Sequence, residues 1–293
     1  MTGADQTTRP PIALSIAGTD PSGGAGIHAD LKTFTARGVL GTTAITALVA
    51  QNTHGVSRVY GIDDDFVSDQ LDSVLNDMPV DATKSGMLGS RSLVELVVAR
   101  AAENQLGFYT VDPVMVATSG HRLLEVDAVA AVRDQLLPVS DLITPNLPEA
   151  ALLLGDDVPV AQTPQEMLDQ ARQLVDRGPR AVLLKGGHAL EGDVADVLVT
   201  AEGAVTEFTH PRVATSNTHG TGCTLSAAIT AEVAVLKRER SVAEVSSDLL
   251  HEAVDNALDY LARALKSAAD WQVSLDPNDA HGPVDHQVDV VRR

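Results

Sequence analysis

Residues 12–34 read IALSIAGTDPSGGAGIHADLKTF, in which a short apolar run, a glycine-rich loop and an amphipathic segment follow one another. The run Ile12–Ala17 has the length of a buried strand, and Ile27, Leu31 and Phe34 recur at the spacing of one helix face. Strand-type and helix-type segments continue to alternate along the chain. This alternation predicts an α/β protein with a mostly parallel sheet that is covered by helices on both faces.

The limits of the other elements follow from the same periodicities. Strands are expected near residues 44–50, 82–87, 107–111, 141–144 and 181–185, and helices near residues 67–78, 92–103, 128–137, 164–177, 221–237 and 242–268. The runs Val194–Val199 and Val205–Phe208 flank a turn at residues 202–203, which predicts a late antiparallel hairpin.

No repeat or linker interrupts this pattern, so we expect one domain over residues 12–275, with loose tails at residues 1–11 and 276–293. The single cysteine excludes an intramolecular disulfide. Because the sequence also has no secretory signal pattern and no long apolar run, the expected location is the cytoplasm.

The chain carries a net charge of −19, with 40 acidic residues against 21 lysines and arginines. Such a surface argues against nonspecific binding to nucleic acid or to anionic lipid. If the protein binds phosphates, positive potential must be concentrated where the phosphates lie. Each lysine near a strand end is therefore a candidate phosphate-binding residue.

Residues 217–224, NTHGTGCT, place the only cysteine, Cys223, in a glycine turn that opens a predicted helix. Unpaired N–H groups at a helix start form an anion site. Three interpretations remain open: a structural turn with a small buried cysteine, a cysteine nucleophile for acyl transfer, which needs a histidine base such as His219, and a phosphoryl-transfer site. The rest of the chain favours the third, in which the helix start lowers the pKa of the Cys223 thiol so that it accepts a proton near neutral pH.

Polar residues also follow the predicted strands, where parallel sheets bind their ligands. Asp112 and Glu149 are candidate Mg²⁺ ligands, although strand-end acids also serve as helix caps. Lys185 is a candidate phosphate-binding cation or a lysine that extends to solvent. Gln51 offers both a donor and an acceptor, as recognition of an aminopyrimidine edge requires, or it is a satisfied strand-end amide.

The glycine cluster at residues 23–26 differs from a dinucleotide fingerprint, because Ala29 stands where the third glycine is needed. We therefore expect a turn that contacts substrate. Asp30, one helical turn later, is either a substrate contact or a solvated carboxylate. The histidines lack metal-ligand spacing, so no zinc is expected.

Five motifs in order resemble the hydroxymethylpyrimidine/phosphomethylpyrimidine kinases of thiamine biosynthesis, which belong to the ribokinase-like superfamily. They are AGTDPSGGAG at 17–26, AQNT at 50–53, TPNLPEA at 144–150, KGGH at 185–188 and THGTGCT at 218–224. The resemblance extends over about residues 12–286. It implies a homodimer of three-layer αβα sandwiches that uses ATP and Mg²⁺ to phosphorylate 4-amino-5-hydroxymethyl-2-methylpyrimidine to the monophosphate and then to the diphosphate.

The resemblance also assigns roles to matching positions, and Cys223 takes the place of the aspartate base of most ribokinase relatives. The implied residues are Cys223, Gly220, Thr221 and Gly222 for catalysis, Gln51, Asp30 and Gly18 for the substrate, Lys185, Asn146 and Thr218 for phosphates, and Asp112 and Glu149 for Mg²⁺. Cys223 would act as a general base or would position the alcohol by a hydrogen bond, without a covalent intermediate.

Two positions depart from the family pattern. Thr118 stands where many members carry a lysine, and residues 279–286 match the family's C-terminal motif only in part. The family also grades into pyridoxal kinases, which phosphorylate a similar hydroxymethyl ring. A pyridoxal or pyridoxine kinase, or a noncatalytic ligand-binding regulatory protein of the same fold, therefore remain the alternatives.

Overall fold

A computed structural model describes residues 9–115, 126–187 and 193–290. Within these ranges the central sheet has eight strands in the order β10-β9-β8-β7-β6-β5-β1-β2. The strands are β1 Ile12–Ala17, β2 Leu40–Ile45, β5 Ala82–Ser85, β6 Phe108–Val111, β7 Leu142–Ile143, β8 Ala181–Lys185, β9 Val194–Thr200 and β10 Val205–His210. The pairs from β2 to β8 are parallel, whereas β9 is antiparallel to both β8 and β10.

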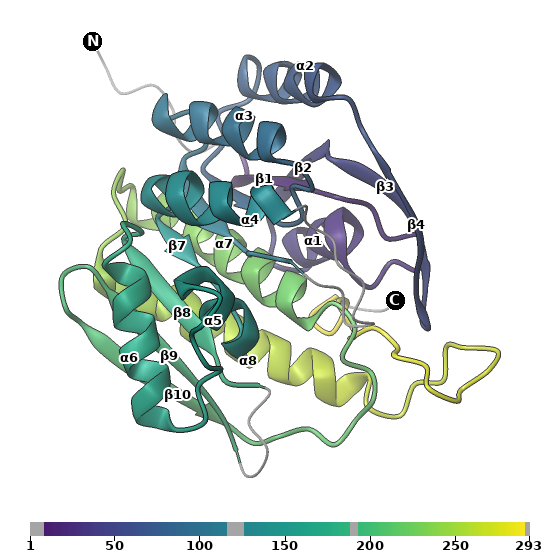
Figure 1. Cartoon of the computed structure of the whole chain (residues 1–293). Helices are drawn as coiled ribbons and strands as arrows, with labels where there is room; N and C mark the ends of the chain where they lie inside the picture. The colour runs from purple at the N-terminus through teal and green to yellow at the C-terminus, as the bar shows by residue number, and fades with distance from the viewer. Residues whose placement is uncertain (1–8, 116–125, 188–192, 291–293) are drawn as a thin grey trace.

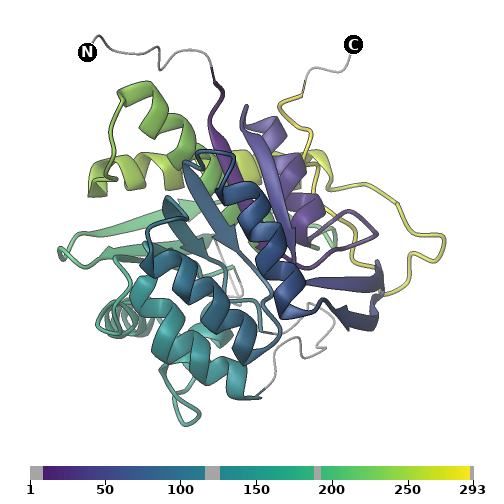
Figure 2. The same cartoon turned by 90° about the horizontal axis from the view of Figure 1, so that it is seen from above.

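Helices cover both faces of this sheet (Figures 1 and 2). One face carries α1 Gly26–Ala36, α7 Thr221–Arg240 and α8 Ser247–Ser267, and the other carries α2 Asp64–Leu75, α3 Arg91–Ala102, α4 Val126–Ala131, α5 Leu147–Leu154 and α6 Pro164–Val175. Two short helical turns, η1 Val132–Leu136 and η2 Leu137–Val139, follow α4. The predicted α/β class, with its mostly parallel sheet and late hairpin, is confirmed.

Each central strand is buried on both faces of the sheet. Its successive side chains point alternately into the hydrophobic cores on the two faces. In β8, Val182 and Leu184 pack with the α2–α6 layer, while Ala181 and Leu183 pack with α7 and α8. Strands buried on both faces read as continuous apolar runs, which is why the sequence located most of them. Among the described residues, no helix is both long and apolar enough to cross a membrane.

The single strand predicted near residues 44–50 is wrong. The chain leaves the main sheet at Thr46, whose hydroxyl donates to the Met87 carbonyl at 2.8 Å. The next strand, β3 Ala47–Asn52, pairs instead with β4 Gly55–Gly61 in a separate antiparallel hairpin beside the main sheet (Figure 1). The sequence missed β4 because most of its residues are exposed and carry no apolar alternation. It also missed α5, a short helix that begins inside a motif.

The C-terminal segment is not loose over residues 282–286. Val284, Asp285 and His286 are buried. The Tyr260 hydroxyl donates to the His286 carbonyl at 2.7 Å, and the backbone N–H of His281 donates to Thr53 in the β3–β4 turn at 2.8 Å. The segment therefore joins α8 to the hairpin. The domain limits of residues 12–275 stay a prediction.

Asp30 is neither a solvated carboxylate nor a substrate contact. It is fully buried, and the Lys84 Nζ lies 3.0 Å from both of its carboxylate oxygens. The Ser15 hydroxyl donates to the same carboxylate at 2.5 Å. Burial raises the pKa of Asp30, and the Lys84 charge opposes but does not cancel that rise. The pair ties β1, α1 and β5 together.

We expect Lys84→Met to lower the free energy of unfolding by about 3–5 kcal/mol, because it leaves the Asp30 carboxylate buried without a partner. Urea denaturation of the ligand-free protein measures the change. The double variant Lys84→Met/Asp30→Leu should recover much of the loss. Lys266→Met, at an exposed position on α8, is the control. A loss no larger than that of the control would contradict a structural role for the pair.

Candidate active site

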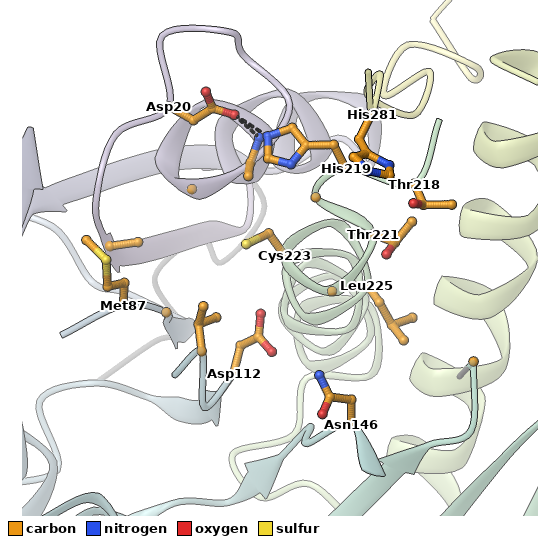
Figure 3. Close-up of a pocket in the computed structure, with 18 of the residues that line it drawn as sticks. Asp20, Met87, Asp112, Asn146, Thr218, His219, Thr221, Cys223, Leu225 and His281 are labelled. Atoms are coloured by element: carbon orange, nitrogen blue, oxygen red, sulfur yellow. Dashed lines mark hydrogen bonds and ion pairs between the residues drawn. The ribbon is translucent and has the colours of Figure 1, made fainter. Parts of the chain in front are cut away.

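A cavity of about 570 Å³ lies at the carboxyl ends of β1, β5, β6 and β8. Its other walls are the loop after β1, the β3–β4 hairpin and the start of α7. Figure 3 shows Cys223, Asp112 and Thr221 from these elements, and Asn146 from the loop between β7 and α5, among the labelled residues that line the cavity. Segments far apart in the sequence thus meet at the sheet edge where the sequence placed the site.

The start of α7 offers backbone donors to this cavity. Gly220, the residue before the helix, has φ 76° and ψ 12°, and no side chain caps this end. A Cβ on Gly220 would lie 1.8 Å from the Gly24 carbonyl oxygen. A Cβ on Gly222 would lie 3.3 Å from the Lys185 Nζ. The two glycines therefore let the loop after β1 and a cation approach the helix start, where the N–H groups without a side-chain cap and the helix dipole favour an anion.

Lys185 lies beside these donors and is held by an acid. Its Nζ is 3.3 Å from Asp112 Oδ1, and Ser226 donates to Asp112 Oδ2 at 3.2 Å. Burial lowers the pKa of Lys185, but the Asp112 and Glu149 charges outweigh burial, so the net shift is upward. The lysine therefore stays positively charged next to the cavity.

Glu149 has two roles in the structure. Its side chain accepts from the Asn146 backbone N–H at 2.8 Å, and Asn146 Oδ1 accepts from the Glu149 N–H at 2.9 Å, so together they cap α5. Both residues also line the cavity. Burial raises the pKa of Glu149 to about 7, with Lys185 opposing the rise and Asp112 adding to it.

The donor set of this region fits Mg²⁺. In the described ranges no three His, Cys, Asp or Glu side chains are grouped as a metal cage. Mg²⁺ in nucleotide-dependent sites commonly takes only one or two carboxylates and completes its shell with substrate phosphates and water. Asp112 and Glu149 line the same cavity, and a cation would relieve the repulsion between them that raises the Glu149 pKa.

Cys223 lines the cavity and is half-buried, but its acidity differs from the sequence expectation. Burial raises the pKa of the thiol to about 11. The positive charge of Lys84 lowers it, whereas Asp112 and Asp30 add to the rise. The expectation that this pKa is low enough for neutral-pH base chemistry is wrong, because the lost hydration and the two carboxylates outweigh the Lys84 charge and the backbone hydrogen bond from Gly26.

The sequence missed a contact between His219 and Asp20. His219 Nε2 lies 2.7 Å from Asp20 Oδ2 and 3.1 Å from Gln51 Nε2 (Figure 3 draws the first contact). Burial would raise the pKa of Asp20, but hydrogen bonds from His219 and Ser22 outweigh it and hold the pKa at about 2. Both contacts use Nε2, and among the described residues no hydrogen bond joins His219 to Cys223, so the structure does not contain the cysteine–histidine pair that acyl transfer requires.

Lys84 is the second residue that sequence reasoning missed. Its only signal was a lysine inside a strand that ends before Gly86. The predicted residues that line the cavity are Gly18, Gln51, Asp112, Asn146, Glu149, Lys185, Thr218, Gly220, Thr221, Gly222 and Cys223. Thr118 lies outside the described residues.

Backbone donors at a helix start, a fixed cation and two acids suit the transfer of a phosphoryl group, in which catalysis rests on alignment and on charge stabilisation. Fold and site together therefore define an α/β phosphotransferase.

Comparison with known proteins identifies the family. Residues 20–285 match the family described as phosphomethylpyrimidine kinase. The chain is 51% identical over 274 residues to the hydroxymethylpyrimidine/phosphomethylpyrimidine kinase of Escherichia coli strain K12, over 94% of this chain and 96% of that protein. The chain therefore belongs to the phosphomethylpyrimidine kinase family.

Solved structures agree with this assignment. The ADP complex of Bacillus subtilis pyridoxal kinase matches with a TM-score of 0.80 and 35% identity, over 94% of this chain and 97% of that one. A phosphomethylpyrimidine kinase from Clostridium difficile matches with a TM-score of 0.72 and 34% identity, over 87% of this chain and 99% of that one.

The Glu149 carboxyl gives a pH prediction for the ligand-free protein. Its pKa of about 7 in the folded state exceeds the usual 4.5, so the folded protein holds this proton more tightly than the unfolded chain. Stability must therefore fall as the pH rises through this window. Glu149→Gln should remove that loss, so that the variant gains stability relative to the wild type between pH 5 and pH 7.5, as measured by urea denaturation.

Glu166→Gln is the matched control, because Glu166 forms the same type of cap on α6 at an exposed position. A difference between wild type and Glu149→Gln that is equal at both pH values would contradict the raised pKa.

Proposed function

We propose that the protein uses ATP to phosphorylate the hydroxymethyl group of 4-amino-5-hydroxymethyl-2-methylpyrimidine, and then phosphorylates the monophosphate to the diphosphate, in thiamine biosynthesis. One observation carries the proposal. The donors at the start of α7 and the Lys185 ammonium line the same cavity as Gln51, an amide suited to a heteroaromatic edge. Membership of a kinase family and the activity for which the Escherichia coli relative is named support it.

Binding would divide between two parts of the cavity. Gln51 and Gly18 would contact the ring, close to the hairpin and the loop after β1. Lys185, Asn146 and Thr218 would bind phosphate oxygens of ATP, and the N–H groups of residues 220–223 would bind the phosphoryl group in transfer. The acceptor oxygen would then lie beside Cys223, which lines the same cavity.

Asp112 and Glu149 would hold Mg²⁺ together with the phosphates. When bound, this ion would neutralise phosphate charge as it moves towards the leaving group. The Lys185 Nζ also lies 3.3 Å from Asp112. Asp112 would therefore orient the Lys185 ammonium in addition to binding Mg²⁺.

The raised thiol pKa favours positioning over base catalysis for Cys223. In a loose phosphoryl-transfer transition state, the attacking alcohol can keep its proton until the new bond is well advanced. A protonated thiol can still make weak hydrogen bonds to the alcohol oxygen. Cys223 would thus align the alcohol with the phosphoryl group and would form no covalent intermediate.

The assembly and the location are also part of the proposal. The family resemblance supports a homodimer, and the single cysteine, which excludes an intramolecular disulfide, supports the cytoplasm.

A substrate panel tests the proposed function. We expect ADP release with the pyrimidine alcohol and with its monophosphate, and a kcat/KM for the alcohol that exceeds that for pyridoxal. Coupled ADP detection with each acceptor, and without any acceptor, gives the comparison. A preference for pyridoxal would identify a pyridoxal kinase instead. Ligand binding without ADP release would identify a noncatalytic binding protein.

We expect Cys223→Ala to lower kcat for the alcohol step by less than about 100-fold, below the usual range for loss of a general base. The KM for ATP should change little. The second step should lose less, because its phosphate acceptor is already ionised. Rapid-quench measurement of each step separates the two, and Cys223→Ser should retain part of the activity. Equal losses in both steps would indicate a structural cysteine, and a trapped phosphocysteine would contradict the mechanism.

A further inference from the structure

One histidine nitrogen contacts two polar side chains from distant elements. His219 Nε2 lies 2.7 Å from Asp20 Oδ2 and 3.1 Å from the terminal amide of Gln51. This nitrogen has one hydrogen-bonding position in the ring plane, so it either donates or accepts there. Its protonation therefore determines which atom of the Gln51 amide can face it.

Asp20 determines that protonation. Its Oδ1 accepts from the Ser22 N–H at 2.9 Å and from the Ser22 hydroxyl at 2.7 Å. Its Oδ2 accepts from the N–H groups of Gly24 at 3.1 Å and Ala25 at 2.8 Å. A buried carboxylate with this many donors is ionised and can only accept. His219 Nε2 must therefore carry the proton that lies between the ring and Asp20.

A protonated Nε2 cannot pair with the NH₂ group of Gln51, because two donors would then face each other. Rotating the Gln51 amide by a half-turn about its Cγ–Cδ bond places Oε1 opposite His219 Nε2–H. This N–H then donates to both Gln51 Oε1 and Asp20 Oδ2. Amide orientation is assigned from such networks. The NH₂ group then takes the position that Oε1 has in the structure, and within the described residues no hydrogen bond is made at that atom. Gln51 lines the cavity, so this donor is available to a ligand.

We propose that His219 is a positioning residue for substrate recognition. Through its Nε2–H it holds the Gln51 amide with the NH₂ group towards the cavity, so that Gln51 donates to an unprotonated ring nitrogen of the acceptor. This inference rests on the proposed function and adds which atom of the ring is recognised.

The same residue joins ring recognition to the phosphoryl site. The His219 backbone N–H donates to the Gly282 carbonyl at 3.0 Å. The next residue is Gly220, which directly precedes α7 and its backbone donors. A Cβ on Gly24 would lie 2.5 Å from the His219 ring. The imidazole therefore packs against the loop after β1, and the His219 backbone is held by the C-terminal segment, which together fix the distance of the ring from Gln51.

Three variants test the proposal by calorimetric titration with the pyrimidine alcohol in the absence of ATP. His219→Leu keeps the bulk but removes the donor, and it should weaken binding about tenfold, with the KM for ATP within about twofold of wild type. His219→Gln places an amide NH₂ near the Nε2 position and should restore binding to within about threefold of wild type. Gln51→Glu keeps an acceptor for His219 but presents an acceptor to the cavity, and it should weaken binding at least tenfold.

Wild-type affinity in His219→Leu or in Gln51→Glu would overturn the proposal. So would an equal loss of pyrimidine and ATP affinity in His219→Leu without rescue by His219→Gln, because it would indicate a purely structural histidine. If His219→Leu does not fold, as judged by thermal melting, Gln51→Glu and His219→Gln decide. Failure of the wild type to bind or phosphorylate the pyrimidine alcohol is a separate result, which would overturn the proposed function and this inference with it.

Discussion

The close approach of the loop after β1 to the start of α7 is the constraint on which the site depends. Only a glycine in the left-handed conformation allows it, because a Cβ on Gly220 would lie 1.8 Å from the Gly24 carbonyl oxygen. The approach brings Asp20 and His219, 199 residues apart in the sequence, to 2.7 Å. It also leaves the first N–H groups of α7 without a side-chain cap, so that they face a cavity that a nucleotide can enter.

Charge is distributed around this contact in a way that suits phosphates. The chain has a net charge of −19, yet two lysines, Lys84 and Lys185, line the cavity at the ends of β5 and β8. Each is paired with an acid, Asp30 or Asp112. These acids keep the lysines protonated in spite of burial, and the same acids raise the pKa of Cys223. The neutral thiol follows mainly from its burial, with a further contribution from the two acids that pair with the lysines.

The sequence predicted the layers and the cavity edge because both follow from short-range patterns. Apolar strand runs located β1 and β8, and motifs at strand ends located Gln51, Asp112 and Lys185. Residues whose environment depends on distant segments were missed or misjudged. Asp30 looked like an ordinary helix carboxylate, and only the fold brings Lys84 onto it. The acidity of Cys223 depends on the charges of Lys84, Asp112 and Asp30. These residues are far from Cys223 in the sequence, so no local pattern predicts their effect. The strand β4 was missed because most of its residues are exposed, so its sequence lacks the apolar alternation that indicates a strand.

In the proposed mechanism, N–H groups of residues 220–223 hold the phosphoryl group beside the Cys223 sulfur. A crystal structure with ADP, the pyrimidine alcohol and aluminium fluoride, a mimic of the transferring phosphoryl group, tests it most directly. The account predicts fluoride atoms within about 3 Å of these backbone nitrogens, with the alcohol oxygen in line and next to the sulfur. A mimic bound away from the start of α7, with Cys223 facing neither fluoride nor alcohol, would contradict it.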